Sequence, residues 1–194
     1  MKLIIFAIIS IIIIIILNKL NTSNLLMPKS SNAYTTAYQL GKNYINTMKN
    51  NNFSNLKYPA VMFDIDDTLI DYNGKPIKPI IKLLNTCIKA GLIVVIITAR
   101  DYKYYDITID QLLKWNIDYE FLFLRNPGDD IKKFKSNIKQ KLAEENDIVT
   151  IMSVGDNVID VDGPYSGYFI KLPNKYSPDL FHLSNSRQIQ KVQY

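Results

Sequence analysis

An apolar segment that ends abruptly in acidic residues constrains the fold of this chain most strongly. Residues 61–63 (Val-Met-Phe) run directly into Asp64-Ile65-Asp66-Asp67-Thr68. Consecutive apolar residues of this kind are typical of a strand buried on both faces, as in a parallel sheet. The switch to aspartate then places carboxylates at the carboxyl end of the strand, which is where open α/β sheets bind ligands. The segment therefore predicts a ligand site at Asp64 and Asp66.

The spacing of these two acids limits what they can do. Asp64 and Asp66 are two positions apart, so in an ideally continued strand both side chains would project from one face. Carboxylates crowded on one face repel each other, which favours a cation, a shared proton or a bound cationic group between them. A solvated acidic turn after a core strand would have the same local sequence. The short segment alone leaves both interpretations open.

Further along the chain, apolar runs that fit buried strands alternate with segments of helical periodicity. A strand, a helix and a second buried strand form a βαβ unit, which requires parallel pairing and a right-handed crossover. We therefore predict an α/β fold with a doubly wound parallel sheet of about five strands. The predicted strands are residues 61–63, 92–97, 119–124, 148–154 and 168–171, and the predicted helices are 33–48, 76–90, 105–113 and 131–142.

Polar residues also stand at the carboxyl ends of two other predicted strands. Thr98 ends the second strand, and Asp156 and Asp160 follow the fourth. Because parallel strands end at the same edge of a sheet, these residues are expected to meet Asp64 and Asp66 in space. An ordered set of this kind is far more specific than one acidic motif, so a solvated turn no longer explains the pattern.

In this order the motifs resemble those of the haloacid dehalogenase-like (HAD) hydrolases: DxDxT, a Thr or Ser ending a second strand, a Lys, and DxxxD after a later strand. Tyr58-Pro59-Ala60 and the segment 125–130 (Arg-Asn-Pro-Gly-Asp-Asp) are similar to the class B and plant vegetative-storage type acid phosphatases, HAD subfamily IIIB. The resemblance covers about residues 33–183. It implies a phosphatase that acts on a phosphorylated small molecule or another accessible phosphomonoester.

The resemblance implies a role for each acidic or hydroxyl residue at the strand ends. Asp64 would be the nucleophile that accepts the phosphoryl group, and Asp66 the general acid and base. Thr98 would hold the phosphate. Asp64, the backbone carbonyl of Asp66, and Asp156 would form an all-oxygen Mg²⁺ site. Asp160 would bind the metal through water or orient the lysine.

The phosphate-binding lysine is the least defined member of this set. Phe134-Lys135-Ser136 is similar to the Phe-Lys-Ser of acid phosphatases in the superfamily. In a helix Lys135 would also neighbour Ile131 and Ile138, beside the buried face. We therefore select Lys135. The candidates near the start of this predicted helix are Lys132, Lys133, Lys135 and Lys139.

The intervals between motifs leave no room for a separate cap domain. A turn and one helix separate the first two motifs, and one helix and one strand separate the second motif from the lysine. The chain is therefore predicted to be capless, with a site roofed at most by the 33–48 helix and the 71–76 turn. An open site accepts many phosphomonoesters, or phosphate on a large molecule. Arg100 is either a second phosphate contact or a salt-bridge partner of Asp101 or Asp106.

The first part of the chain has a different composition. Residues 3–17 are almost purely apolar, with a length between a signal-peptide core and a full membrane span. We interpret residues 1–18 as a transmembrane anchor or signal segment, residues 19–32 as a polar linker and residues 184–194 as a polar tail. The chain would then contact a membrane through residues 3–17 and be anchored by a single span or secreted.

The net charge of +5 is mildly basic, but no Arg-rich run of the kind that tracks a nucleic-acid backbone is present. No specific nucleic-acid partner is therefore predicted. The alternatives to a broad phosphomonoesterase are a nucleotidase, a polynucleotide or protein phosphatase, a membrane scaffold, and a non-catalytic binding or storage protein on the same fold. The retention of every residue of the site argues against a non-catalytic protein, because a retired site usually loses its nucleophile.

Overall fold

A computed structural model describes residues 30–50, 55–176 and 180–184 of the chain. The predicted anchor and most of the predicted linker and tail lie outside these residues. Among the described helices, none combines the length and apolar character needed to cross a bilayer. The helices are α2 (Ser30–Asn50), α3 (Lys78–Lys89), the 3₁₀ helix η2 (Tyr102–Tyr104), α4 (Tyr105–Lys114), α5 (Phe134–Asn146) and α6 (Val158–Val161), and the strands are β1 (Tyr58–Phe63), β2 (Ile93–Asp101), β3 (Phe121–Arg125), β4 (Ile148–Gly155), β5 (Tyr168–Lys171) and β6 (Phe181–Ser184).

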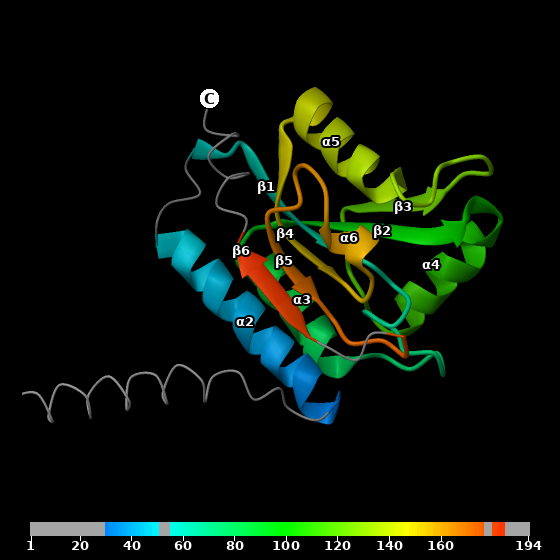
Figure 1. Cartoon of the computed structure of the whole chain (residues 1–194), viewed down its shortest axis with the longest axis horizontal. Coiled ribbons are helices and arrows are strands. Elements are labelled where there is room, and N and C mark those ends of the chain that lie inside the picture. Colours follow the sequence, from blue (N-terminus) through cyan, green and yellow to red (C-terminus); the bar gives the residue numbers. More distant parts are fainter. Residues whose placement is uncertain (1–29, 51–54, 177–179, 185–194) are drawn as a thin grey trace, which may run out of the picture.

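The strands form one sheet in the order β3-β2-β1-β4-β5-β6 (Figure 1). The first five strands are parallel, as predicted, and β6 pairs antiparallel with β5. The sixth strand, which joins the sheet only through its pairing with β5 among the described strands, was not predicted. β1 is central: Phe63 pairs with Ile96 of β2 and with Val154 of β4. The carboxyl ends of β1, β2 and β4 therefore lie side by side.

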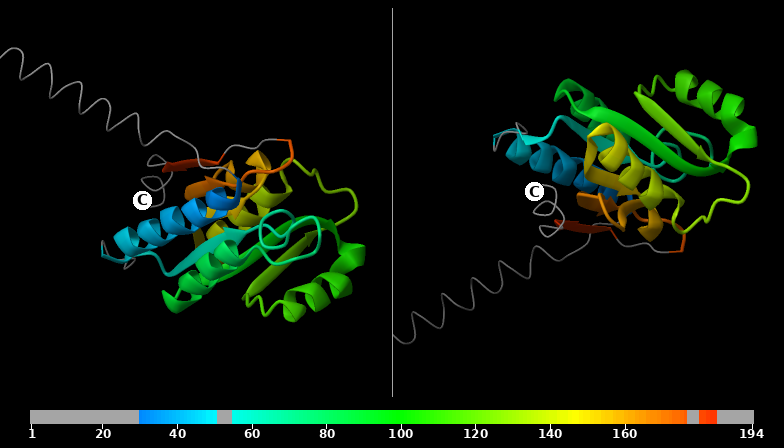
Figure 2. Two further views of the ribbon diagram at one scale, coloured as in Figure 1. Left: turned by 90° about the horizontal axis from the view of Figure 1, so that it is seen from below. Right: turned by 90° about the horizontal axis from the view of Figure 1, so that it is seen from above.

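Alternate residues of the central strands pack into two separate cores. Val61 and Phe63 of β1 belong to the core that α2 and α3 cover, whereas Ala60 and Met62 belong to the core under Phe134 of α5. Figure 2 shows the same arrangement, with α2 and α3 on one side of the sheet and α5 on the other. Burial on both faces explains why the strands are continuously apolar. The doubly wound architecture is thus confirmed.

The packing of α2 against α3 depends on one small residue. A Cβ atom at Gly41 of α2 would lie 2.7 Å from both terminal methyl carbons of Leu83, a fully buried residue of α3. The missing side chain lets the two helices approach closely. α2 begins at Ser30, three residues before the predicted start, and Cys87 of α3 is buried in the same core. The N-terminal helix is therefore an integral layer of the domain.

The chain leaves the sheet directly after β1. The amide of Asp64 still donates to the carbonyl of Val154 at 3.0 Å, but the amides of Leu69 and Ile70 both turn back to the carbonyl of Ile65. Asp67, inside this turn, has a φ of 53°, in the left-handed region. The expectation that the strand continues and carries both acids on one face is therefore wrong. A tight turn replaces it and sends the two carboxylates to different partners.

Candidate active site

Lys135 lies between two buried carboxylates at the carboxyl edge of the sheet. Its ammonium group contacts Oδ1 of Asp64 and lies 2.6 Å from Oδ1 of Asp160. Asp64 is only 5% exposed, and Lys135 and Asp160 are each 2% exposed. The hydroxyl of Thr68, the threonine of the first motif, is 3.5 Å from the other oxygen of Asp64. The residues chosen from the sequence as nucleophile and phosphate ligand therefore touch.

The start of α5 determines which lysine reaches the site. α5 begins at Phe134, which anchors it in the core, and Lys135 is buried while Lys132 and Lys133 are exposed. Ile131 is half exposed and precedes the helix, so it does not mark the buried face as predicted. Phe134 marks that face instead. Lys135 therefore lies at the site, although one of the neighbours used to select it does not share its buried face. Its contact with phosphate stays a prediction.

Asp160 is held in place by the turn that carries it. One of its oxygens accepts a hydrogen bond from the amide of Asn157 at 2.9 Å, and the Asn157 side chain accepts one from the amide of Ile159 in return. This capping box begins α6. A Cβ atom at Gly155 would lie within 2.7 Å of Cγ of Asp160. Glycine at the end of β4 therefore provides the space that the Asp160 side chain occupies.

Three carboxylates of this edge form a group that fits a divalent cation. One oxygen each of Asp64, Asp156 and Asp160 lie within 4.8 Å of one another. Burial raises the pKa of Asp64, although Lys135 opposes the shift, and burial raises the pKa of Asp156 to about 6. A bound cation would lower the pKa of both carboxyl groups. An all-oxygen set of this kind suits a hard cation such as Mg²⁺.

Asn174 is a member of the site that the sequence analysis missed. Its side-chain amide donates to Oδ2 of Asp156 at 2.9 Å and to the Asp156 backbone carbonyl at 2.8 Å. Asn174 follows β5, and no sequence motif distinguishes it from other loop asparagines. The bonds fix Asp156 from a part of the chain that no local pattern connects to it.

Asp66 points away from this group of three acids. Arg100 at the end of β2 binds both of its oxygens, from Nε at 2.9 Å and from Nη2 at 2.6 Å. Asp101, a predicted partner of Arg100, instead accepts a hydrogen bond from the amide of Lys103. The prediction that Arg100 pairs with Asp101 or Asp106 is therefore wrong. The predicted metal contact of Asp66 involves its backbone carbonyl and stays a prediction.

Thr98 is fully buried near the end of β2, and its hydroxyl accepts a hydrogen bond from the amide of Arg100 at 3.3 Å. Pairing of β2 with β3 becomes irregular between Thr98 and Asp101. β2 continues to Asp101, so Thr98 lies three residues before the strand end and does not end the strand as predicted. Its contact with phosphate stays a prediction.

The N-terminal half of α2 faces the acidic edge. Burial raises the pKa of the Tyr34 phenol, and the negative charges of Asp67, Asp156 and Asp71 raise it further. The indole of Trp115 donates to the carbonyl of Gly74, which joins the turn after β1 to the end of α4. These elements are the ones expected to border the site.

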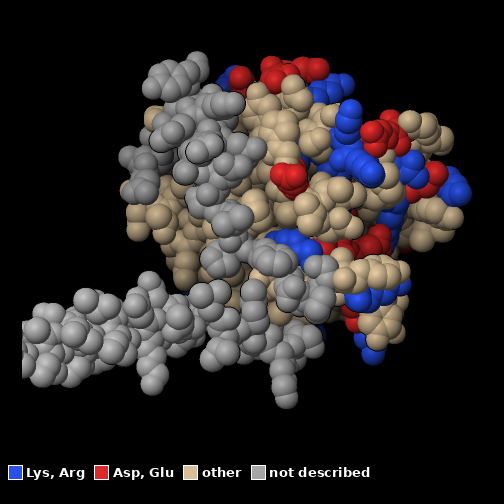
Figure 3. Space-filling model, in the orientation of Figure 1, with Lys and Arg blue, Asp and Glu red and all other residues tan. Residues whose placement is uncertain are grey.

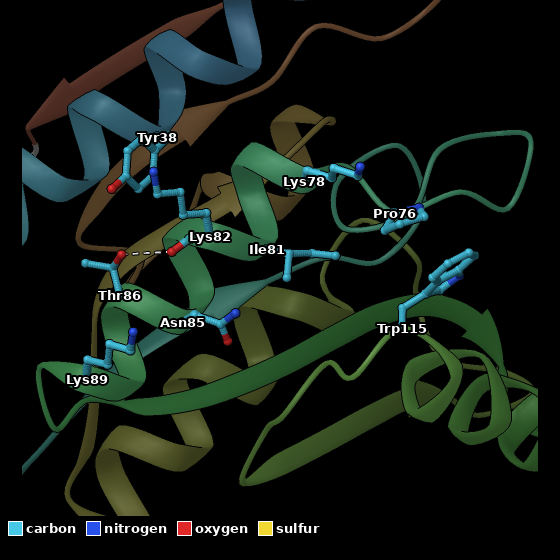
Figure 4. Close-up of a pocket in the computed structure, with 9 residues that line it drawn as sticks. All are labelled: Tyr38, Pro76, Lys78, Ile81, Lys82, Asn85, Thr86, Lys89 and Trp115. Carbon is cyan, nitrogen blue, oxygen red and sulfur yellow. Dashed lines mark hydrogen bonds between the residues drawn. The ribbon is translucent and has the colours of Figure 1, made fainter.

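A cavity of about 500 Å³ lies along α3, apart from the acidic group (Figure 4). None of its lining residues is acidic, so it lacks both a carboxylate nucleophile and metal ligands. The ammonium of Lys82 lies 4.8 Å from the centre of the Tyr38 ring. On the face of the molecule seen in Figure 3, basic and acidic side chains are interspersed. The lining residues are Tyr38, Pro76, Lys78, Ile81, Lys82, Asn85, Thr86, Lys89 and Trp115.

Comparison with known families agrees with the site. Residues 71–179 match the model of the HAD superfamily, subfamily IIIB (Acid phosphatase). This match covers more than half of the chain, and the chain belongs to that family. The resemblance implied this family, and the match confirms it. The matched range includes Lys135 and Asp160 and begins after Asp64. None of the curated proteins matches the chain.

Similar folds occur among solved structures. The class C acid phosphatase from Bacillus anthracis superposes with a TM-score of 0.60 at 18% sequence identity, over 84% of this chain and 89% of that one. A chain of the Pnkp1/Rnl/Hen1 complex matches with a TM-score of 0.47 at 23% identity over 57% of this chain. A chain of the Pnkp1/Rnl/Hen1 RNA repair complex matches with a TM-score of 0.47 at 26% identity over 56%. This chain spans less than half the length of the latter two, 46% and 39%.

Proposed function

We propose that this protein is a Mg²⁺-dependent phosphomonoester hydrolase that forms an aspartyl-phosphate on Asp64. One observation carries the proposal: Asp64 is buried at the end of the central strand, in contact with Lys135 and grouped with Asp156 and Asp160. A buried carboxylate beside two others is unfavourable unless positive charge balances it. Lys135 supplies one such charge, and a divalent cation would supply the rest.

In the first step, an oxygen of Asp64 attacks the phosphorus atom of the ester. The Asp64 O–P bond forms as the bond from phosphorus to the leaving oxygen breaks, and that oxygen takes the proton of Asp66. The ammonium of Lys135 and the hydroxyl of Thr98 bind the phosphoryl oxygens. Phosphoryl transfer depends mainly on positioning and on stabilising charge, and these two groups serve both purposes.

In the second step, water attacks the phosphorus atom and gives a proton to Asp66, now a carboxylate. The Asp64 O–P bond breaks, inorganic phosphate leaves and both acids return to their starting states. The side chain of Asp66 is 62% exposed, so it can reach leaving groups of different size outside the buried group. Asp64 is buried and Asp66 is exposed, and this difference supports the assignment of Asp64 as the nucleophile and of Asp66 as the general acid and base.

The residues present fit a bound Mg²⁺ ion. Asp64, Asp156 and the carbonyl of Asp66 would hold it, and the ion would neutralise charge on the phosphoryl oxygens. The contact of 2.6 Å between Asp160 and Lys135 favours Asp160 as the residue that orients the lysine. Asn174 would keep Asp156 in position through its two hydrogen bonds.

The substrate class follows from the lack of a cap. Within the described residues, only the 64–77 loop and α3 separate Asp64 from β2, and only η2, α4 and β3 with their loops lie between Thr98 and α5. Neither interval contains a folded unit that would enclose a substrate. We therefore propose broad activity on accessible phosphomonoesters, and a panel of nucleotides, sugar phosphates and phosphopeptides would identify the preferred group.

The test is hydrolysis of an aryl phosphate by the full chain, with Mg²⁺ and with EDTA, beside Asp64→Asn and the exposed control Asp110→Asn. We expect activity that requires the metal, a loss of at least about 1,000-fold in Asp64→Asn and no change in Asp110→Asn. The parent protein should carry a phosphoryl group that hydroxylamine removes, as expected of an aspartyl-phosphate, and Asp64→Asn should carry none. Activity that survives in folded Asp64→Asn would contradict the assignment of the nucleophile.

A further inference from the structure

Lys139 is a second buried lysine of α5 that the proposed reaction does not use. It is fully buried, one helical turn after Lys135. Its ammonium donates to the backbone carbonyl of Asp160 at 3.1 Å, to that of Asp162 at 3.2 Å and to the hydroxyl of Ser166 at 2.5 Å. All three acceptors are neutral, and all belong to the segment 160–166 that follows β4.

This arrangement is costly for the fold. Removing an ammonium group from water costs several kcal/mol even after the protein relaxes, and neutral acceptors repay less of that cost than a carboxylate would. Burial lowers the pKa of Lys139 to about 7, with a smaller contribution from the charge of Lys135, although the charges of Asp160 and Asp162 oppose the shift. An apolar side chain of similar length would fill the same space at a smaller cost. The position therefore needs a reason beyond packing.

One of the three contacts of Lys139 is to the backbone of Asp160, the residue whose side chain binds Lys135. The carboxylate of Asp160 binds Lys135 and the amide of Asn157, while its backbone carbonyl binds Lys139. Residues four apart lie on the same face of a helix. Lys135 and Lys139, on successive turns of α5, therefore bind the side chain and the backbone carbonyl of Asp160.

The hydroxyl of Ser166 links Lys139 to a further residue of the segment 160–166. It accepts from Lys139 and donates to the carbonyl of Asp162 at 2.7 Å. The carbonyl of Ser166 is tied to the sheet separately, by the hydroxyl of Ser153 of β4 at 2.8 Å. Besides the contact of Asp160 with Lys135, the segment is therefore bound to α5 through Lys139 and to β4 through Ser153, and the phenol of Tyr165 donates to Glu144 of α5 at 3.1 Å.

We propose that Lys139 is a positioning residue that fixes Asp160, and through Asp160 the Lys135–Asp64 contact at which phosphate and metal would bind. The link to catalysis rests on the proposed function. The restraint that Lys139 places on residues 157–166 does not depend on the proposed function, and it can be measured on the metal-free protein. Groups that orient metal or phosphate ligands commonly change metal affinity or activity by about 10- to 100-fold when removed.

The test replaces Lys139 by methionine in the full chain and measures three quantities. Amide exchange of residues 157–166 in the metal-free protein should accelerate, because the amides of Asp160 and Asp162 bond only within this short segment. The rise in melting temperature on adding Mg²⁺ should be smaller. In phosphatase assays, the Mg²⁺ concentration for half-maximal activity should rise about tenfold, and kcat should fall while KM changes little.

Two further variants keep the result interpretable. Ser166→Ala removes one acceptor and leaves Lys139 in place, so it should shift the same quantities less. Ser153→Ala is the matched control, because it removes the hydrogen bond between the segment and β4 without touching Lys139. It should lower thermal stability and leave the Mg²⁺ requirement unchanged.

The outcomes separate this proposal from the proposed function. Unchanged exchange at residues 157–166 in Lys139→Met would overturn the positioning role whatever the enzyme does. A Mg²⁺ requirement that shifts equally in Ser153→Ala and Lys139→Met would also overturn it, since the effect would then be general loosening. If the parent shows no Mg²⁺-dependent activity, the proposed function fails, and faster exchange in Lys139→Met alone would still support the hold on Asp160.

Discussion

The guanidinium of Arg100 and the carboxylate of Asp66 form a two-point ion pair, with nitrogen to oxygen distances of 2.9 and 2.6 Å. Arg100 is itself fixed, because its third nitrogen donates to the buried hydroxyl of Thr108 at 3.3 Å. The two aspartates of the first motif therefore bind different cations: Lys135 contacts Asp64, and Arg100 contacts Asp66. A planar fork fixes the orientation of a carboxylate as well as its charge. In the proposed mechanism this separation would keep the group that takes and gives protons apart from the nucleophile.

Replacing Arg100 by methionine tests the importance of this orientation. The Asp66 side chain is mostly exposed, and exposed ion pairs contribute at most about 1 kcal/mol, so stability should change little. We expect kcat to fall by about tenfold or more, because Asp66 would no longer be held for proton transfer. The Mg²⁺ requirement should stay constant, since the Asp66 carboxylate is outside the group of three acids. Lys103→Gln is the control, and unchanged kcat in Arg100→Met would contradict the orienting role.

Lys135→Met should destabilise the metal-free protein strongly. The change leaves Asp64 and Asp160 buried without their shared cation, and breaking a buried ion pair on one side costs about 3–5 kcal/mol. Urea unfolding with EDTA measures this loss. Mg²⁺ should restore more stability to the variant than it adds to the parent, while activity should remain lost. Lys133→Met, at an exposed position, should change the free energy of unfolding by less than about 0.5 kcal/mol. Equal effects of the two variants would mean that Lys135 is not the lysine of the site.

Gly155→Ala should disturb Asp160 directly. The added methyl group would overlap the Asp160 side chain, and overpacking of this kind costs about 1–3 kcal/mol. We expect reduced stability together with a higher Mg²⁺ requirement. Gly128→Ala is the matched control: its φ of +94° is strained for alanine, but no atom lies within 4 Å of the added methyl. It should reduce stability by about 1 kcal/mol or somewhat more and leave the Mg²⁺ requirement unchanged.

The raised pKa of Asp156 should make the free energy of unfolding of the metal-free protein depend on pH. Burial raises its pKa from 3.8 in the unfolded chain to about 6 in the folded protein, so the folded state binds the proton more tightly. The stability that this adds is complete below pH 4 and is lost as the pH rises through about 6. In EDTA, the parent should therefore lose about 1–2 kcal/mol relative to Asp156→Asn between pH 4 and 7, allowing for partial solvent screening. Denaturant titrations at several pH values measure this difference.

Saturating Mg²⁺ should reverse that trend, because the cation binds the deprotonated carboxylate. Lys139 does not confuse the measurement. The destabilisation that goes with its lowered pKa of about 7 is constant well below that pH, is relieved only as the pH rises above it, and is present in both the parent and Asp156→Asn. A difference between parent and Asp156→Asn that stays flat or grows from pH 4 to 7 would contradict the raised pKa.

Much of the fold follows from local patterns that the sequence contains in full. Continuously apolar segments such as 92–97 require burial on both faces, and helices between them force parallel strands and right-handed crossovers. Once strands are parallel, the residues at their carboxyl ends must share one edge. This is why Asp64, Asp156 and Asp160 could be expected to meet although about 90 residues separate the first from the others.

Other features could not be read from local patterns. The place of β6 in the sheet depends on its antiparallel pairing with β5, and Asn174 is one of many loop asparagines. The turn after Phe63 also reversed a prediction: a strand that continued would have placed Asp66 beside Asp64, whereas hydrogen bonds to Ile65 direct it to Arg100. Such turns depend on backbone bonds that sequence spacing does not specify.

By itself, the sequence determined which chemical groups are available and at which edge of the sheet they gather, because the alternation of buried strands and helices leaves one arrangement. Only the tertiary structure decided how these groups pair. Lys135 and Lys139 are similar residues one turn apart, yet one contacts the carboxylates of Asp64 and Asp160 and the other binds neutral carbonyls. The pairing of charges depends on distances of a few ångströms between segments far apart in the chain, and packing of α5 against the sheet sets those distances.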